Sequence, residues 1–257
     1  MKQFWNKLLS FFHWSKSSYI ILSSFLLIIF LIGYIWWPLL QEYAASYRGD
    51  LPFWVQVDWL LTILIMINAD LKRDIPLAAI ALVGGLLIEA WGTQTELWTY
   101  YTNEHPPLWI IPAWPIAFLA VNRLVQLIEH LLPTITRRLV EISYWVIFSG
   151  FYILMIFYIW PTITKPLSIA VIILCAILIL TNFNKKDASF YFLAGSGLGY
   201  FLELWGTSRA CWTYYTQEAP PLFAVFAHGF AAFAVWQFYQ FTIRIFNLIH
   251  KRISLKS

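Results

Sequence analysis

Two glutamates, Glu89 and Glu203, begin a stretch of residues that the chain contains twice. Residues 89–108 read EAWGTQTELWTYYTNEHPPL and residues 203–222 read ELWGTSRACWTYYTQEAPPL, with an offset of 114 and identity at 13 of 20 positions. The shared positions hold acids, tryptophans and tyrosines, whereas the flanking apolar segments match only in character. A carboxylic acid in an apolar site can donate a proton, and aromatic rings can stabilise a cation. We therefore expect the duplicated stretch to contain the functional site of the protein.

Both glutamates lie near the end of an apolar segment, where an ionised carboxylate is costly. We expect a neutral acid that can give a proton, unless a cation pairs with it. The alternative is a glutamate that reaches the membrane interface or bonds a neighbouring helix. His228 is a further candidate, because the other copy has Trp114 at the matching position, so one half holds a titratable group where the other holds a wall. The alternative for His228 is an imidazole satisfied by a helix neighbour. The catalytic candidates are thus Glu89, Glu203 and His228.

The repeated aromatic residues are candidates for binding a substrate. They could line the opening of a site, where their π faces would stack on a polyene or stabilise a cation. The alternative is a belt of rings at the membrane interface, where tryptophan and tyrosine are enriched. Glycine follows three residues after each glutamate, and we expect Gly92 and Gly206 to end their helices. The substrate-binding candidates are Trp91, Trp98, Tyr100, Tyr101, Trp114, Trp205, Trp212, Tyr214 and Tyr215.

The composition is that of a polytopic membrane protein. Hydrophobic residues make up 60% of the chain and charged residues only 12%, with a mean hydropathy of +0.67, whereas a soluble chain has roughly a quarter of its residues charged. The net charge of +4 does not indicate nucleic-acid binding, because the basic residues fall in loops between apolar segments. The two cysteines, Cys175 and Cys211, form no CxxC pattern, and no phosphate-binding loop or metal-binding motif is present. We expect no cofactor and no metal.

The apolar segments predict an all-α fold with about eight transmembrane helices in two parallel four-helix repeats. The expected spans are about 18–40, 52–68, 76–91 and 108–131, followed by 139–160, 166–183, 188–205 and 222–250. The expected organisation is an amphipathic cytoplasmic lead-in at 1–16, a first repeat at 17–131, a linker at 132–138, a second repeat at 139–250 and a cytoplasmic tail at 251–257.

The distribution of lysine and arginine predicts the orientation in the membrane. With the N-terminus inside, the outer loops keep only Arg48, Lys165 and Arg209. This favours an N-in, C-in protein with both motif loops outside. We expect its location to be a bacterial inner (plasma) membrane, although the charge pattern fits archaea equally. Two repeats with an even number of helices share one orientation, so an axis along the membrane normal would relate them. That axis would bring the two motif loops together.

The first copy of the motif resembles a known family. Its motif glutamate and glycine are followed by paired tyrosines, a proline and a tryptophan, here Glu89, Gly92, Tyr100, Tyr101, Pro112 and Trp114. This pattern resembles the carotenoid 1,2-hydratase family of membrane proteins and is more loosely similar to the integral-membrane lycopene cyclases. The resemblance covers about 30 residues per copy, and the Pro-Phe-Gly step of the family is replaced here by QTELW at 94–98. It implies a cofactor-independent hydratase or cyclase that protonates a long isoprenoid, with Glu89 as the motif glutamate.

Three functions remain open from the sequence. The first is an intramembrane enzyme for an isoprenoid or carotenoid-like lipid, with the two glutamates as proton donors. The second is a transporter with a pseudo-symmetric pathway between the halves, for which Asp58 is a candidate charge within a span. The third is a non-catalytic subunit of a membrane complex, which would dock through the motif loops.

Overall fold

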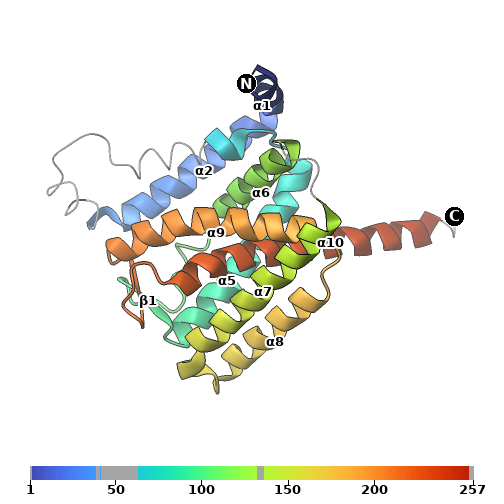
Figure 1. Ribbon diagram of the computed structural model, residues 1–257. Coiled ribbons are helices and arrows are strands. Elements are labelled where there is room, and N and C mark those ends of the chain that lie inside the picture. The colour runs from blue at the N-terminus through green and yellow to red at the C-terminus, as the bar shows by residue number, and fades with distance from the viewer. Residues whose placement is uncertain (1, 39–40, 42–62, 132–135, 255–257) are drawn as a thin grey trace.

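The computed structural model describes residues 2–38, 41, 63–131 and 136–254, and Figure 1 shows an assembly of helices with one small sheet. Asp58 and most of the expected span at 52–68 lie outside the described residues. The elements in chain order are α1 Lys2–Phe11, α2 Lys16–Ile35, α5 Leu71–Gln94, β1 Trp98–Tyr100, α6 Ala113–Leu131, α7 Arg137–Tyr158, the 3₁₀ turn η1 Trp160–Thr162, α8 Pro166–Leu180, α9 Lys185–Ser208, β2 Trp212–Tyr214 and α10 Leu222–Ser254.

Helices α5 and α9 begin where the sequence supplies an acceptor for a free backbone N–H group. The side chain of Asp70 accepts from the backbone N–H of Lys72 (3.0 Å) at the start of α5. The side chain of Asn184 accepts from the backbone N–H of Asp187 (3.2 Å) at the start of α9. Each bond satisfies a donor that a helix leaves without a partner in its first turn. The two helices therefore start 114 residues apart, as the sequence offset requires.

The duplication extends to details of the backbone. Helices α5 and α9 begin and end at positions offset by 114, and so do β1 and β2. Positive φ angles recur at Glu96 and Ala210, and cis peptide bonds recur before Pro106 and Pro220. The motif copies therefore share one local structure despite their seven differences in sequence.

The two motif loops meet in an antiparallel pair of strands. Strands β1 and β2 pair so that Thr99 lies opposite Thr213, its own counterpart in the repeat. Trp98 then lies opposite Tyr214, and Tyr100 opposite Trp212. A register of this kind is what a two-fold axis through the Thr99–Thr213 pair produces. The predicted meeting of the two loops is confirmed.

Helices α9 and α10 lie in the middle of the assembly, with α5 and α6 on one side and α7 on the other (Figure 1). Aromatic rings fill the space between α7 and this central pair. The ring of Phe151 stacks on that of Phe230 with centroids 4.8 Å apart, and Phe148 contacts Phe233 edge-on at 4.7 Å. Burying such rings supplies a large part of the packing energy.

Four of the described helices, α2, α5, α7 and α10, are long and apolar enough to cross a membrane. Helix α8 has only 15 residues. Helix α9 has 24 residues, but its mean hydropathy is lowered by polar and small residues that it buries, among them Ser189, Ser196 and Glu203. The structure therefore supports a mostly helical protein with at least these four candidate spans.

Several predicted boundaries were wrong. Helix α6 begins at Ala113 instead of 108, because residues 101–112 form a succession of turns. Helix α7 begins at Arg137, inside the expected linker at 132–138, and α10 continues past 250 to Ser254. Helix α7 can begin this early because Arg137 and Arg138 are exposed, so their charged ends reach water while their backbone is helical.

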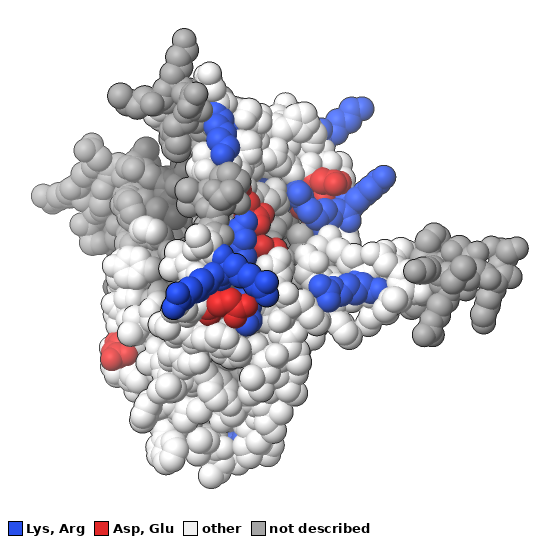
Figure 2. Space-filling view, turned by 45° about the vertical axis from the view of Figure 1, so that its right-hand side comes forward, with Lys and Arg blue, Asp and Glu red and all other residues white. Residues whose placement is uncertain are grey.

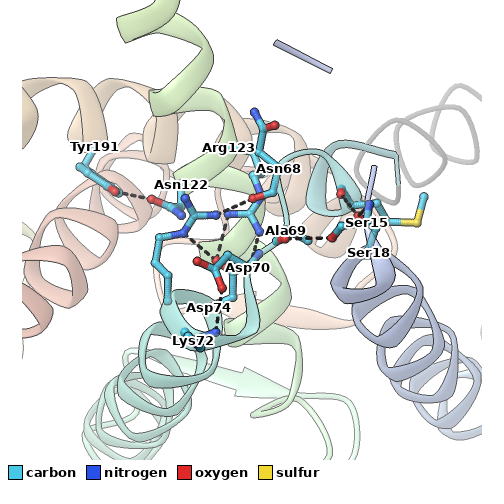
Figure 3. A network of polar contacts seen from close by, with 12 residues as sticks. Ser15, Ser18, Asn68, Ala69, Asp70, Lys72, Asp74, Asn122, Arg123 and Tyr191 are labelled. Carbon is cyan, nitrogen blue, oxygen red and sulfur yellow. Dashed lines mark hydrogen bonds and ion pairs between the residues drawn. The ribbon is translucent and has the colours of Figure 1, made fainter. Parts of the chain in front are cut away.

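A buried ion pair joins α5 and α6 at the end of the bundle away from the sheet (Figure 3). Arg123 is 0% exposed and Asp74 is 2% exposed, and the guanidinium donates to both carboxylate oxygens. Next to it the hydroxyl of Tyr191 donates to Asn122 (2.5 Å), which links α9 to α6. The second half has Ala188 and Gln237 at the positions of Asp74 and Arg123, so this pair has no counterpart there.

Lysine and arginine gather toward the same end as this ion pair (Figure 2). The starts of α5, α7 and α9 each contribute two adjacent basic residues, and the lower part of the view is almost free of charge. The basic residues at these three helix starts are Lys72, Arg73, Arg137, Arg138, Lys185 and Lys186.

Candidate functional site

Glu89 lies in the last turns of α5 and accepts three hydrogen bonds. Trp98 donates its indole N–H (3.1 Å) and Tyr100 its hydroxyl (3.0 Å) to Oε2 of Glu89. Trp114 of α6 donates its indole N–H to Oε1 (3.2 Å). The glutamate is 4% exposed. All three partners are neutral donors, so they suit a carboxylate acceptor.

Glu203 of α9 has the same arrangement with one substitution. Trp212 donates its indole N–H (2.9 Å) to Oε2, and Tyr214 donates its hydroxyl (2.8 Å) to Oε1. The third partner is Nε2 of His228 on α10, at 2.9 Å from Oε1. His228 thus takes the place that Trp114 has beside Glu89. Trp114 lines the cavity as expected, and its indole N–H also reaches the carboxylate as the imidazole does in the other half.

The two clusters interlock across the pseudo-two-fold axis. Each side chain that bonds to one glutamate lies against a side chain that bonds to the other. The ring contacts are Trp98–Tyr214 at 5.8 Å, Tyr100–Trp212 at 5.8 Å and Trp114–His228 at 5.5 Å between centroids, the last of them stacked. The two carboxylates therefore belong to one site.

Burial fixes the protonation of the two strand tyrosines. Loss of solvation on burial raises the pKa of the Tyr100 and Tyr214 hydroxyls well above their usual value, and the neighbouring glutamates raise it further. Both phenols therefore remain protonated at neutral pH and keep donating to the carboxylates.

Glycine makes room for the rings that reach each glutamate. A Cβ atom on Gly92 would lie 1.9 Å from the indole of Trp98, and one on Gly206 would lie 2.0 Å from that of Trp212. The expectation that these glycines end their helices was wrong, because α5 continues to Gln94 and the positive φ angle falls at Glu96. These positions need glycine because a ring packs directly on the helix backbone.

A cavity of about 340 Å³ lies beside both carboxylates. It is bounded by α2, α5, α6, α9, α10 and the two strands, and most of its lining is apolar. Small side chains on α6, namely Ala113, Ala117 and Ala120, leave much of the space free. A cavity of this size and character suits an apolar molecule with one reacting end near the acids. Among the described residues, no group of three His, Cys, Asp or Glu could hold a metal ion.

Ten of the twelve predicted site residues line this cavity. They are Glu89, Glu203, His228, Trp91, Trp98, Tyr100, Trp114, Trp205, Trp212 and Tyr214. The structure places Tyr101 and Tyr215 elsewhere. Their hydroxyls donate to the backbone carbonyls of Ile35 and Tyr158, each at 2.5 Å. Both tyrosines therefore tie a motif loop to the end of α2 or α7.

Three further residues of the site were missed. Gly85 and Gly199 lie one turn before the glutamates, and a Cβ atom there would lie 2.2 Å from Trp114 and 2.4 Å from His228. The sequence offers a signal for these two glycines, because they occupy matching positions at the offset of 114. Trp36 at the end of α2 also lines the cavity and stacks on Trp205 at 4.6 Å. No repeat signal points to Trp36, because it lies outside the duplicated stretch.

Comparisons with known proteins add no further information about this site. No protein-family model, no curated protein and no solved structure matches the chain.

Proposed function

We propose that the protein is an integral membrane enzyme that protonates a double bond of an isoprenoid or carotenoid-like lipid without a cofactor. The observation that supports this best is the pair of glutamates that face one apolar, aromatic cavity. A solvent-poor site of this kind strengthens the electrostatic interactions within it. The resemblance of the motif to the carotenoid hydratases favours the same substrate class.

The reaction would begin with proton transfer from a glutamic acid to one carbon of a C=C bond. The π electrons form the new C–H bond, the other carbon becomes a tertiary cation, and the acid becomes a carboxylate. The indole faces of the cavity and the second carboxylate would stabilise that cation. Trp98, Tyr100 and Trp114 hold Glu89 in place, and their counterparts hold Glu203.

Two outcomes are open to the cation, and the products differ in mass. Water can add to the cation and return one proton to the carboxylate, which gives a tertiary alcohol. Alternatively, a second double bond of the substrate can close on the cation, and loss of a neighbouring proton gives a cyclic isomer. Hydration makes the product heavier by one water, whereas cyclisation leaves the mass unchanged.

The experiment is expression of the protein in bacteria that accumulate an acyclic carotenoid, with mass analysis of the extracted lipids. The wild type should convert the carotenoid to a hydrated or cyclised product. Replacing both acids, in Glu89→Gln/Glu203→Gln, should reduce turnover by at least about a hundredfold, as expected for loss of an acid catalyst. No conversion by the wild type of any acyclic polyene tested would contradict the proposal.

The matched control is Glu104→Gln. Glu104 belongs to the same motif but is exposed, and it accepts from Thr102 and Trp109 (2.6 Å) outside the cavity. This variant has the same change of charge and should keep the wild-type rate.

The proposal places the protein in a bacterial inner membrane with eight spans, the N-terminus inside and the motif loops outside. The gathering of basic residues at the end away from the sheet supports this orientation. In intact cells, a cysteine at Glu104 should react with an impermeant thiol reagent and one at Lys186 should not. Labelling of the second site alone would reverse the orientation.

A further inference from the structure

The two halves of the site differ in how the charge of the carboxylate is balanced. Among the described residues, Glu203 has an ionisable partner in His228, whereas Glu89 accepts only from two indole groups and one phenol. Neutral donors satisfy the lone pairs of a carboxylate but bring no positive charge. A charge without a counter-ion in an apolar site is costly.

The surroundings of Glu89 suit a cation that lacks hydrogen-bond donors. The lining of the cavity includes Trp98 and Trp114, which donate to Glu89, and also Trp91 and, at the end of α2, Trp36. Indole faces attract cations, with tryptophan the most effective ring. Because both oxygens of the glutamate already accept hydrogen bonds from its own neighbours, the bound group needs charge and an apolar surface and no N–H of its own.

We propose that the cavity binds a lipophilic cation, for which Glu89 is the counter-ion. A quaternary alkylammonium has the required chemistry, with a diffuse charge on an apolar head and an alkyl chain that occupies the rest of the cavity. The proposal rests on the proposed function in one respect, because the quaternary ammonium group resembles in charge and apolar surface the tertiary carbocation of the proposed reaction. It further assigns charge stabilisation to Glu89 and leaves the pair of Glu203 and His228, which can hold one proton between them, as the source of the proton.

The experiment measures binding of tritiated octyltrimethylammonium to the purified protein in lipid nanodiscs by equilibrium dialysis, with empty nanodiscs as the background. The wild type should bind the ammonium ion above that background. Glu89→Gln should weaken binding about tenfold or more, because a buried charge pair is lost. Glu104→Gln has the same change of charge outside the cavity and should bind as the wild type does.

A second variant tests the proposal by a gain of binding, which misfolding cannot produce. His228→Trp installs the residue that the first half has at this position, and Gly199 leaves the same space beneath it as Gly85 leaves beneath Trp114. The substitution removes the ionisable partner of Glu203, so that both glutamates then accept only from neutral indole and phenol groups among the described residues. It should tighten binding of the ammonium ion several-fold. Equal binding by the wild type and Glu89→Gln, or no tightening in His228→Trp, would overturn the proposal.

The outcome is separable from that of the proposed function. Ammonium binding that depends on Glu89, in a protein that converts no polyene, would retain the cation site and favour a transporter of lipophilic cations over an enzyme. Conversion of a polyene without ammonium binding would retain the enzyme and remove the role of Glu89 as a counter-ion.

Discussion

At the scale of single residues, the site depends on glycines that let large rings lie against helix backbones. The indole of Trp98 reaches the carboxylate of Glu89 only because Gly92 has no side chain, and Gly206 does the same for Trp212. A tryptophan held in this way has little freedom to move, so the carboxylate stays in one position. Precise placement of an acid is what proton transfer requires.

Gly92→Ala should therefore destabilise the protein and displace Trp98. The added methyl group would overlap the indole, and overpacking of this kind costs about 1–3 kcal/mol. Thermal unfolding in detergent, followed by tryptophan fluorescence, measures the loss. Gly150→Ala is the matched control, because a Cβ atom on Gly150 of α7 meets nothing within 4 Å. Equal melting temperatures for the two variants would contradict the role given to Gly92.

At the scale of elements, the pairing of β1 with β2 joins the two halves of the chain. The register brings Thr99 opposite Thr213, and the backbone N–H groups of Tyr101 and Tyr215 donate to the carbonyls of Cys211 and Leu97 at 3.1 and 3.0 Å. The two tyrosine hydroxyls then bond to the ends of α2 and α7. The sheet is short, but it positions four of the six side chains that bond to the glutamates.

Thr99→Cys/Thr213→Cys should form a disulfide between the loops under mild oxidation. Residues directly opposite in an antiparallel pair have Cα atoms about 4.5–5.5 Å apart, which a disulfide can span. Cleavage of the chain between the halves, followed by electrophoresis without reductant, shows whether the fragments remain joined. Thr102→Cys/Thr216→Cys, outside the pairing register, should link much less. The same yield from both pairs would exclude the register described here.

At the scale of the whole molecule, two halves with one plan have different interiors. The first half buries the ion pair of Asp74 with Arg123, where the second has Ala188 and Gln237 (Figure 3). Gln237 instead donates to the carbonyl of Leu178 at 3.1 Å. The same divergence separates Trp114 from His228 at the site. Duplication thus supplies the symmetric frame, and the later differences give each half its own electrostatics.

Asp74→Ala should cost about 3–5 kcal/mol, because it leaves the buried guanidinium of Arg123 without its partner. Adding Arg123→Gln reproduces the residue pair of the second half and should restore most of that stability. Thermal unfolding of the single and double variants in the same detergent makes the comparison. A double variant no more stable than the single one would show that the ion pair is not what this end of the bundle requires.

The sequence by itself determined the features that depend on composition and repetition. Hydropathy indicated a membrane protein built of helices, because an apolar helix of sufficient length is recognisable without its neighbours. The repeat predicted that the motif loops meet, because two units that share one orientation carry their loops on the same face, and an axis along the membrane normal brings these loops together. The repeat also identified Glu89 and Glu203 and most of the rings around them.

Tertiary structure decided the contacts that depend on how the two halves pack together. The direction of an indole or a phenol is set by the space left around it, so adjacent residues such as Tyr100 and Tyr101 diverge, one to the carboxylate of Glu89 and one to the carbonyl of Ile35. Trp36 lines the cavity although it lies outside the duplicated stretch. Gly92 contacts the indole ring of Trp98. The helix boundaries near 108 and 137 could not be predicted from hydropathy, because turns and charged helix ends depend on contacts with neighbouring parts of the chain.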